Sequence, residues 1–166
     1  MCNVTFRTLS KYDELDIRKR GFQMKPSFLI KRELIERTTE YEDALAVWAL
    51  LVSLRDDDDA LPYLVASEQT LTANLFDDVP SRSQRTRIKN GLAYLRKINY
   101  IQTEDCGCSI IKVYFNDSHN EKQDNKDLIL LHGEDLINVF QSNTKMNKFS
   151  LYRTFCMIVR YMDSPT

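Results

Sequence analysis

The stretch that decides the fold is Ser67–Phe115, which reads SEQTLTANLFDDVPSRSQRTRIKNGLAYLRKINYIQTEDCGCSIIKVYF. It predicts a short helix, a turn and a longer basic helix, followed by two strands joined by a tight hairpin. The first helix is expected over Ser67–Phe76, with Leu71 and Leu75 on one apolar stripe and Ser67 as its cap. The polar, proline-containing segment 77–80 then interrupts the chain, as the turn of a helix-turn-helix requires.

The second, basic helix is expected from Ser81 to Lys97. Ser81-x-x-Gln84 has the form of a capping box. The segment contains no acid and six basic residues, namely Arg82, Arg85, Arg87, Lys89, Arg96 and Lys97. In helical projection its apolar stripe is formed by Ile88, Leu92 and Leu95. The opposite side carries Ser83, Thr86, Arg87 and Asn90, with Arg82 and Lys89 at its flank, and such side chains can meet base edges and phosphates in the major groove of DNA.

The two strands are expected over residues 100–103 and 110–115, with Gly107 at the turn between them. This hairpin offers little to DNA, because Glu104 and Asp105 lie on it and Lys112 is its one basic residue. Four aromatic residues surround the hairpin in sequence, and we expect them to pack beneath it rather than to form a stacking platform for single strands. They are Tyr94, Tyr100, Tyr114 and Phe115.

These features resemble the winged helix-turn-helix of replication initiators and transfer-region proteins of Gram-positive plasmids and integrative elements. The resemblance covers roughly residues 22 to 115. It is carried by Ser67, Leu71, Leu75, Ser83, Thr86, Leu92 and Tyr100-Ile101. It implies a protein without enzymatic activity that binds double-stranded DNA at an origin of replication or of transfer.

The distribution of charge favours a nucleic-acid partner more than the net charge of −1 does. Residues 81–112 carry seven basic and two acidic side chains, whereas residues 38–80 carry one basic and ten acidic side chains. The sharpest basic block is therefore the proposed recognition helix. We expect its affinity for DNA to be modest and strongly dependent on salt.

The composition is that of a soluble globular protein of 166 residues, large enough for one ordinary core or two small ones. No apolar run approaches the roughly 20 residues that span a bilayer, and residues 1–10 lack the apolar region of a signal peptide. The four cysteines show no disulfide framework. We therefore expect a cytoplasmic protein.

The sequence of the first 37 residues predicts three segments of different structure. Residues 1–21 are interpreted either as a solvated extension or as a basic arm whose Arg18, Lys19 and Arg20 contact phosphates or the minor groove. The next segment, Phe22–Ile30, is expected to be extended because it contains a proline. A short helix is expected over Lys31–Arg37.

The segment Tyr41–Arg55 is expected to be a central buried helix, because apolar side chains surround it on almost every side. Leu45, Trp48 and Leu51 lie on its main stripe. The acidic run 56–59 that follows lacks the spacing and the glycine of a calcium loop, and is interpreted as solvated.

Residues 116–127 contain no apolar side chain and are predicted to be an exposed linker. Beyond it the chain repeats an earlier order of elements. The strand and helix expected from residues 28–35 resemble those expected from residues 129–137, and a long apolar helix follows each. We therefore predict a mainly α fold with small β-hairpins: a winged helix-turn-helix over residues 22–115, then a second, possibly incomplete winged-helix-like unit over residues 128–166.

No arrangement of residues indicates catalysis, a metal or a cofactor. Cys106-Gly107-Cys108 has neither a second pair nor a nearby histidine, so it is interpreted as a plain hairpin tip. His119 and His132 lack a partner at the spacing of a triad or a metal pair. Glycine-rich phosphate-binding motifs are absent from the sequence.

The favoured function is therefore binding of double-stranded DNA. Arg82, Arg85 and Lys89 are expected to anchor phosphates. The side chains expected nearest base edges are Ser83, Gln84, Thr86, Arg87 and Asn90. A homodimer or a tandem pseudo-dimer would supply a second half-site. Two alternatives stay open: a protein-interaction module of the primosome type that exposes the segment Phe22–Arg37, and a transcriptional repressor.

Overall fold

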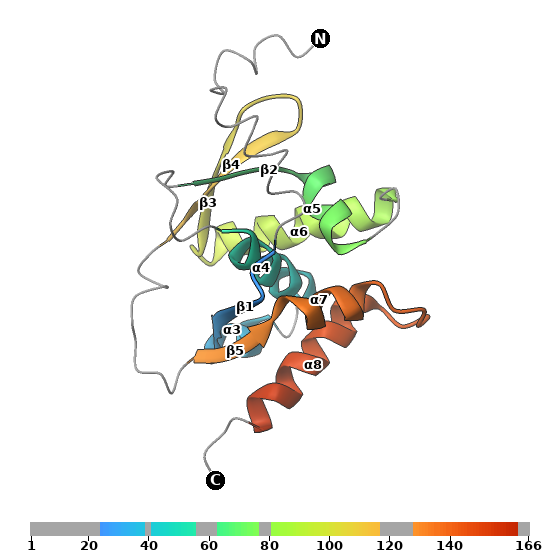
Figure 1. Cartoon of the computed structure of the whole chain (residues 1–166). Coiled ribbons are helices and arrows are strands. Elements are labelled where there is room, and N and C mark those ends of the chain that lie inside the picture. Colours follow the sequence, from blue (N-terminus) through green and yellow to red (C-terminus); the bar gives the residue numbers. More distant parts are fainter. Residues whose placement is uncertain (1–23, 39–40, 56–62, 77–80, 117–127, 163–166) are drawn as a thin grey trace.

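The computed structural model describes residues 24–38, 41–55, 63–76, 81–116 and 128–162 (Figure 1). These residues form an α+β structure with two small antiparallel sheets, as the sequence predicts at this coarse level. The elements are β1 (Ser27–Lys31), α3 (Arg32–Arg37), α4 (Glu42–Leu54), β2 (Tyr63–Ser67), α5 (Glu68–Leu75), α6 (Arg82–Lys97), β3 (Ile101–Asp105), β4 (Ile110–Phe115), β5 (Leu128–His132), α7 (Gly133–Phe140) and α8 (Lys148–Met162). Within the described residues, no helix has both the length and the apolar character needed to cross a membrane.

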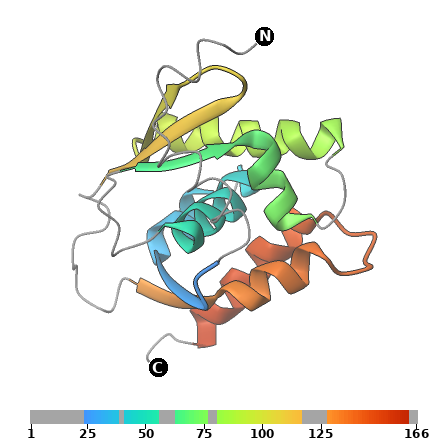
Figure 2. The same cartoon turned by 45° about the horizontal axis from the view of Figure 1, so that its top comes forward.

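The central helix of the molecule is α4. Ten of its side chains are buried, and it packs against α6 on one side and against α7 and α8 on the other (Figures 1 and 2). The prediction of a buried helix over residues 41–55 is confirmed. Its Trp48 meets Tyr100 edge to face, with ring centroids 5.1 Å apart, and lies 5.9 Å from the ring of Phe115. These contacts fix the hairpin against α4.

The three-stranded sheet has the order β2-β4-β3. The hairpin of β3 and β4 is the predicted one, and its turn holds three consecutive residues with positive φ, from Gly107 at 81° to Ser109 at 63°. Strand β2 was not expected from the sequence. It pairs antiparallel with β4 from Tyr63 opposite Tyr114 to Ser67 opposite Ile110. The strand before the helix pair is therefore the edge strand next to β4.

Both predicted helix starts are confirmed. The Ser67 hydroxyl accepts a hydrogen bond of 3.0 Å from the Thr70 amide at the start of α5. At the start of α6, the Ser81 hydroxyl accepts from the Gln84 amide at 3.1 Å, and the Gln84 side chain accepts from the Ser81 amide at 2.9 Å. This capping box satisfies amides that would otherwise lack intrahelical partners.

The predicted repeat is present as two runs of strand, short helix and long helix: β1, α3 and α4, then β5, α7 and α8. The two runs pair with each other, because β1 and β5 form an antiparallel ladder centred on Leu29 opposite Leu130. Those two leucines are the residues that the sequence repeat makes equivalent. Their neighbours on both strands are buried, whereas Leu29 is 50 % exposed and Leu130 is 49 % exposed.

The C-terminal elements share one hydrophobic core cluster with the rest of the described chain, so the second run of the repeat packs directly on the first. The core cluster joins Ile30 and Leu45 of the first run to Ile129 and Tyr152 of the second. The physical reason is that each run has an apolar inner face, and pairing β1 with β5 buries both faces together. The described residues of the second run also contain no second helix-turn-helix or hairpin.

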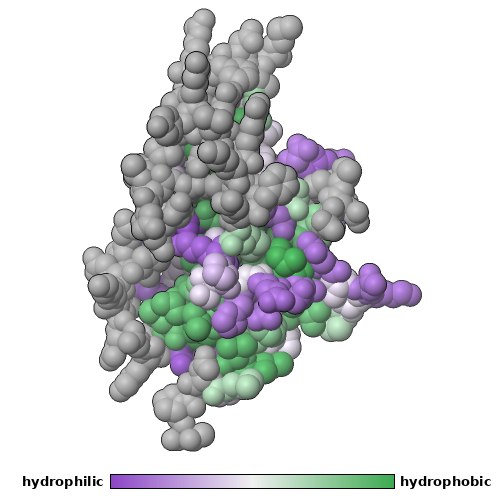
Figure 3. Space-filling model, viewed as in Figure 1, coloured by the Kyte–Doolittle hydropathy of each residue, from purple (hydrophilic) through white to green (hydrophobic). Residues whose placement is uncertain are grey.

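Apolar side chains remain exposed on the outer side of this paired region. Besides the two leucines, α8 exposes Ile158, Tyr161 and Met162 near its end. Figure 3 shows hydrophobic residues gathered over the lower half of the view, where β1, β5 and α8 lie in Figure 1. Several sequence features lie outside the described residues: the N-terminal segment 1–21 with Arg18-Lys19-Arg20, the acidic run 56–59, the segment 77–80, and residues 117–127 of the expected linker, which include His119.

Candidate nucleic-acid interface

The helix α6 has one buried and one exposed side. Ile88 and Leu95 are fully buried, and Leu92 is 3 % exposed, as the predicted apolar stripe requires. The exposed side is called the α6 face below. Its residues are Arg82, Ser83, Arg85, Thr86, Lys89, Asn90, Ala93, Arg96 and Lys97. The face therefore brings together six of the eight residues that the sequence assigned to DNA contact, and adds Arg96 and Lys97 at its far end.

The cations of the α6 face are available to a ligand. The side chains of Arg82, Arg85 and Lys89 are exposed and make no hydrogen bond or ion pair with any described part of the chain. Arg96 donates a hydrogen bond of 2.8 Å to the hydroxyl of Thr103 on β3. Because the sixteen residues of α6 include no acid, the positive charges add to a single cationic strip.

Two residues that the sequence placed nearest base edges have structural contacts instead. Gln84 uses its side-chain oxygen in the capping box. Arg87 lies at the flank of α6, where its guanidinium donates to the Asp43 carboxylate at 3.1 Å and to the Asn147 side-chain oxygen at 3.0 Å. The same group lies 5.3 Å from the ring centroid of Phe149. Arg87 therefore joins α6 to the start of α4 and to the start of α8.

The partner of Arg87 is a partly buried carboxyl group. Burial raises the pKa of Asp43 above its usual value, while the Arg87 guanidinium opposes that rise. Asn147 completes the junction: its oxygen also accepts from the Phe149 amide at 3.0 Å, and its side-chain nitrogen donates to Glu42 at 3.3 Å. A residue between α7 and α8 thus ties the C-terminal run to the flank of α6.

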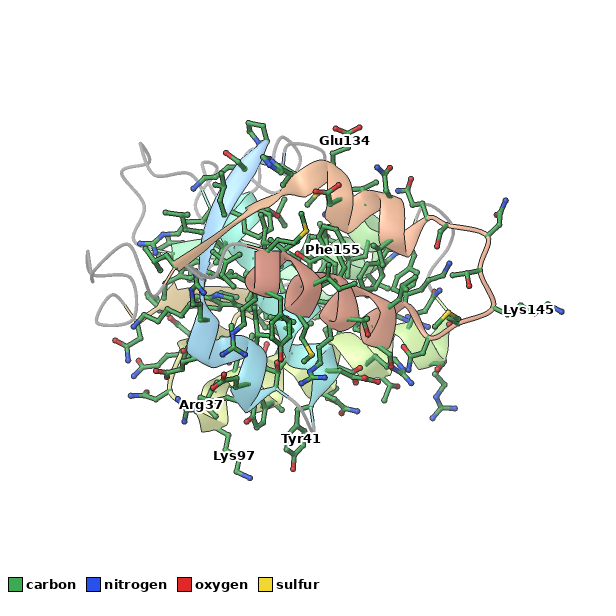
Figure 4. The ribbon with its side chains drawn as sticks, turned by 90° about the horizontal axis from the view of Figure 1, so that it is seen from below. Arg37, Tyr41, Lys97, Glu134, Lys145 and Phe155 are labelled. Carbon is green, nitrogen blue, oxygen red and sulfur yellow. The ribbon has the colours of Figure 1, made fainter. Side chains whose placement is uncertain are left out.

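A groove of about 720 Å³ runs beside the α6 face, between α6 and the start of α4. Tyr41 and Tyr94 stack across it, with ring centroids 4.3 Å apart and ring planes 15° apart, and Tyr94 donates to the Arg37 carbonyl at 2.9 Å. Figure 4 shows Arg37, Tyr41 and Lys97 projecting at the same end of the molecule. Glu42 and Asp43 also line the groove, so its wall on α4 is acidic and its wall on α6 is basic.

Two of the four aromatic residues expected to pack beneath the hairpin, Tyr100 and Phe115, are buried against Trp48. Tyr100 is 1 % exposed and Phe115 is 9 % exposed. Tyr94, in contrast, packs on Tyr41 away from the hairpin. None of these three rings is arranged as an open platform, because a neighbouring ring covers each of them.

The hairpin itself is not cationic. Lys112 lies over the ring of Tyr63, 4.5 Å from its centroid, and stands opposite Glu104 in the ladder. The Tyr114 hydroxyl donates to the Glu104 carboxylate at 3.0 Å. Cys106 is a buried free thiol. The described surface that suits a polyanion is therefore the α6 face rather than the hairpin.

No protein-family model, curated protein or solved structure matches this chain. In the described part of the chain, no three His, Cys, Asp or Glu side chains gather as metal ligands would.

Proposed function

We propose that this chain is a sequence-specific binder of double-stranded DNA that places α6 in the major groove from a winged helix-turn-helix. The order of elements supports this proposal: a buried helix, a strand, two helices and a hairpin follow one another from α4 to β4. The strand before the helix pair joins the last strand of the hairpin, which gives the sheet order β2-β4-β3. In this arrangement α6 is held from behind by α4 and α5, and its cationic side is left open.

The observation that carries the proposal is the α6 face, on which three cations lack internal partners among the described residues. Arg82, Arg85 and Lys89 would meet phosphates, because long cationic side chains neutralise the backbone without regard to sequence. Ser83, Thr86 and Asn90 would lie nearest base edges, where asparagine can pair with adenine. Gln84 and Arg87 are left out of these contacts because the side-chain oxygen of Gln84 and the guanidinium of Arg87 already bond within the protein.

By resemblance, the proposed target is an origin region of a mobile element, of replication or of transfer. The described residues provide one reading helix per chain, so a second half-site would need a second copy. Binding by two copies predicts a palindromic or directly repeated site. Selection of bound duplexes from a random pool, followed by footprinting, would define that site.

A protein-interaction module of the same fold is less well supported by the contacts. That alternative needs the segment from Phe22 to Arg37 to be open, yet β1 pairs with β5, and α3 packs against α8. Leu34 and Ile35 are fully buried. On β1, the exposed residues are Ser27 and Leu29. A repressor would use the same α6 face as an initiator.

The test is fluorescence anisotropy with a duplex over a series of salt concentrations. We expect the logarithm of the association constant to fall linearly with the logarithm of salt concentration. Arg85→Ala and Lys89→Ala should each weaken binding to cognate and random duplexes alike, and should each reduce the slope by about 0.9. Asn90→Ala should instead lose preference for the cognate duplex, by roughly 1–3 kcal/mol.

The control is Lys112→Ala, which removes one positive charge from the hairpin. Because Lys112 already lies over Tyr63, this variant should bind like the parent. Parental affinity and salt dependence in both Arg85→Ala and Lys89→Ala would overturn the placement of α6 in the groove.

A further inference from the structure

We infer that the connection between α7 and α8 is a second part of the DNA-binding surface. In this inference, Lys145 contacts a phosphate of the DNA backbone that borders the major groove occupied by α6. This inference rests on the proposed function and extends it to the C-terminal half of the chain. It is carried by a cationic groove, by the contacts that fix the groove's wall, and by the position of Lys145.

The groove lies between the first turn of α6 and the residues that lead into α8. It encloses about 320 Å³. Among the described residues, three cations and no carboxylate line it, and the described lining is Phe76, Ser83, Gln84, Arg87, Lys145, Met146, Asn147, Lys148 and Phe149. Ser83 belongs both to this lining and to the α6 face, so the groove continues the cationic strip of α6 to one side.

The wall of the groove is held in place by side chains of both halves. Asn147 accepts from Arg87 and donates to Glu42. Below it, the ring of Phe149 lies 5.1 Å from Phe140 and 6.2 Å from Phe76, centroid to centroid. The connection therefore keeps a fixed distance from α6, as a preorganised contact surface requires.

Lys145 is the cation of this groove that is left for a ligand. Arg87 is occupied by Asp43 and Asn147, and Lys148 donates to the backbone carbonyl and the hydroxyl of Ser142. Lys145 is exposed and makes no hydrogen bond or ion pair within the described chain. Figure 4 shows its side chain pointing away from the body of the molecule, at the edge where the connection emerges.

The chemistry of the groove fits the sugar–phosphate backbone rather than base edges. A recognition helix in the major groove has a phosphate backbone along each side. A lysine beside the helix, rather than on its front, would reach that backbone and neutralise one phosphate as a point charge. Its contact would therefore raise affinity for every duplex equally and would add to the salt dependence of binding.

The experiment compares Lys145→Gln, Lys145→Arg and Arg160→Gln in the full chain, by anisotropy with cognate and random duplexes over a salt series. Arg160→Gln is the control for loss of one positive charge, because it removes that charge from the other end of α8, about 20 Å along a helix of fifteen residues, where Arg160 pairs with Glu36. We expect Lys145→Gln to reduce the salt slope by about 0.9 and to weaken both duplexes by the same factor. Lys145→Arg should keep most of the slope, and Arg160→Gln should match the parent.

Phosphate-ethylation interference on the cognate duplex then locates the contact. With the parent, ethylation of one phosphate beside the α6 site should interfere with binding, and with Lys145→Gln that interference should disappear. If Arg85→Ala weakens binding while Lys145→Gln keeps the parental slope and interference pattern, this inference is overturned and the proposed function stands. If neither substitution changes binding, both are overturned.

Discussion

At the scale of single residues, the ion pair of Arg87 with Asp43 links stability to pH. Burial raises the pKa of Asp43 above its unfolded value of 3.8, so the folded protein holds the Asp43 proton more tightly than the unfolded chain does. Ionisation of Asp43 therefore costs stability as the pH rises through the interval above 3.8. Arg87 limits this cost, because its guanidinium favours the carboxylate.

We therefore expect Arg87→Ala to lower the free energy of unfolding by about 1–2 kcal/mol near neutral pH, where it leaves a partly buried carboxylate without its cation. The loss should shrink on acidification, since protonation of Asp43 removes the unpaired charge. Urea unfolding over a range of pH values measures both effects.

The control combines Arg87→Ala with Asp43→Asn, which leaves no carboxylate to titrate at this position. The difference in free energy of unfolding between this double variant and Asp43→Asn alone should not change with pH over the interval in which Asp43 titrates. An Arg87→Ala variant as stable as the parent at every pH would contradict this account of the junction.

The role of Arg87 shows what helical projection can and cannot predict about the site. Projection correctly separated the buried Ile88, Leu92 and Leu95 from an exposed cationic side, because that separation depends only on the period of α6. The partners of Arg87 lie 44 and 60 residues away in the sequence, so no local period could reveal them. For the same reason, no local period could reveal that Lys145 lies beside the first turn of α6.

At the scale of elements, the contact between α4 and α6 depends on Gly91. A methyl group added there would lie 2.6 Å from Cγ2 of Val47 and 2.9 Å from the carbonyl oxygen of Asp43. Backbone atoms cannot move aside cheaply, so the glycine permits the close approach of the two helices. The same substitution would improve the helix propensity of α6 by about 1 kcal/mol.

We expect the clash to outweigh the propensity, so that Gly91→Ala destabilises the protein by roughly 1–2 kcal/mol net. Ala93→Gly is the matched control two residues along, on the exposed side of α6, and should cost about 1 kcal/mol through propensity alone. Denaturant unfolding of both variants measures the difference. A Gly91→Ala variant more stable than the parent would show that α4 and α6 can move apart to admit the methyl group without a loss of stability.

Most elements could be predicted because their signals are local. The helices α4, α5 and α6 have apolar stripes, two of them have caps, and the hairpin has a Gly107 turn between β-rich runs. Strand β2 has only the five residues YLVAS, the last of which is the cap of α5, and its partner β4 comes more than forty residues later. The pairing of β1 with β5 was missed likewise, although the repeat itself was visible.

At the scale of the whole molecule, the paired runs imply that both ends of the described chain unfold together. Ile129 on β5 is fully buried and stands opposite Ile30 on β1. The same core contains Trp48 of α4, the one tryptophan in the chain. Loss of packing on β5 should therefore be visible at Trp48, even though the two residues belong to different runs of the repeat.

We expect Ile129→Ala to lower the free energy of unfolding by about 2–5 kcal/mol, because it opens a cavity in the shared core. Trp48 fluorescence and far-ultraviolet circular dichroism should report the same shifted midpoint, as a single cooperative transition requires. Leu130→Ala on the same strand is the matched control, and its half-exposed side chain should cost much less. If Ile129→Ala instead leaves the Trp48 transition in place and adds a second transition at lower denaturant, residues 128–162 unfold separately. The C-terminal run would then detach at the Asn147 junction while α6 stays folded, and the proposed DNA binding through α6 would persist after residues 128–162 unfold.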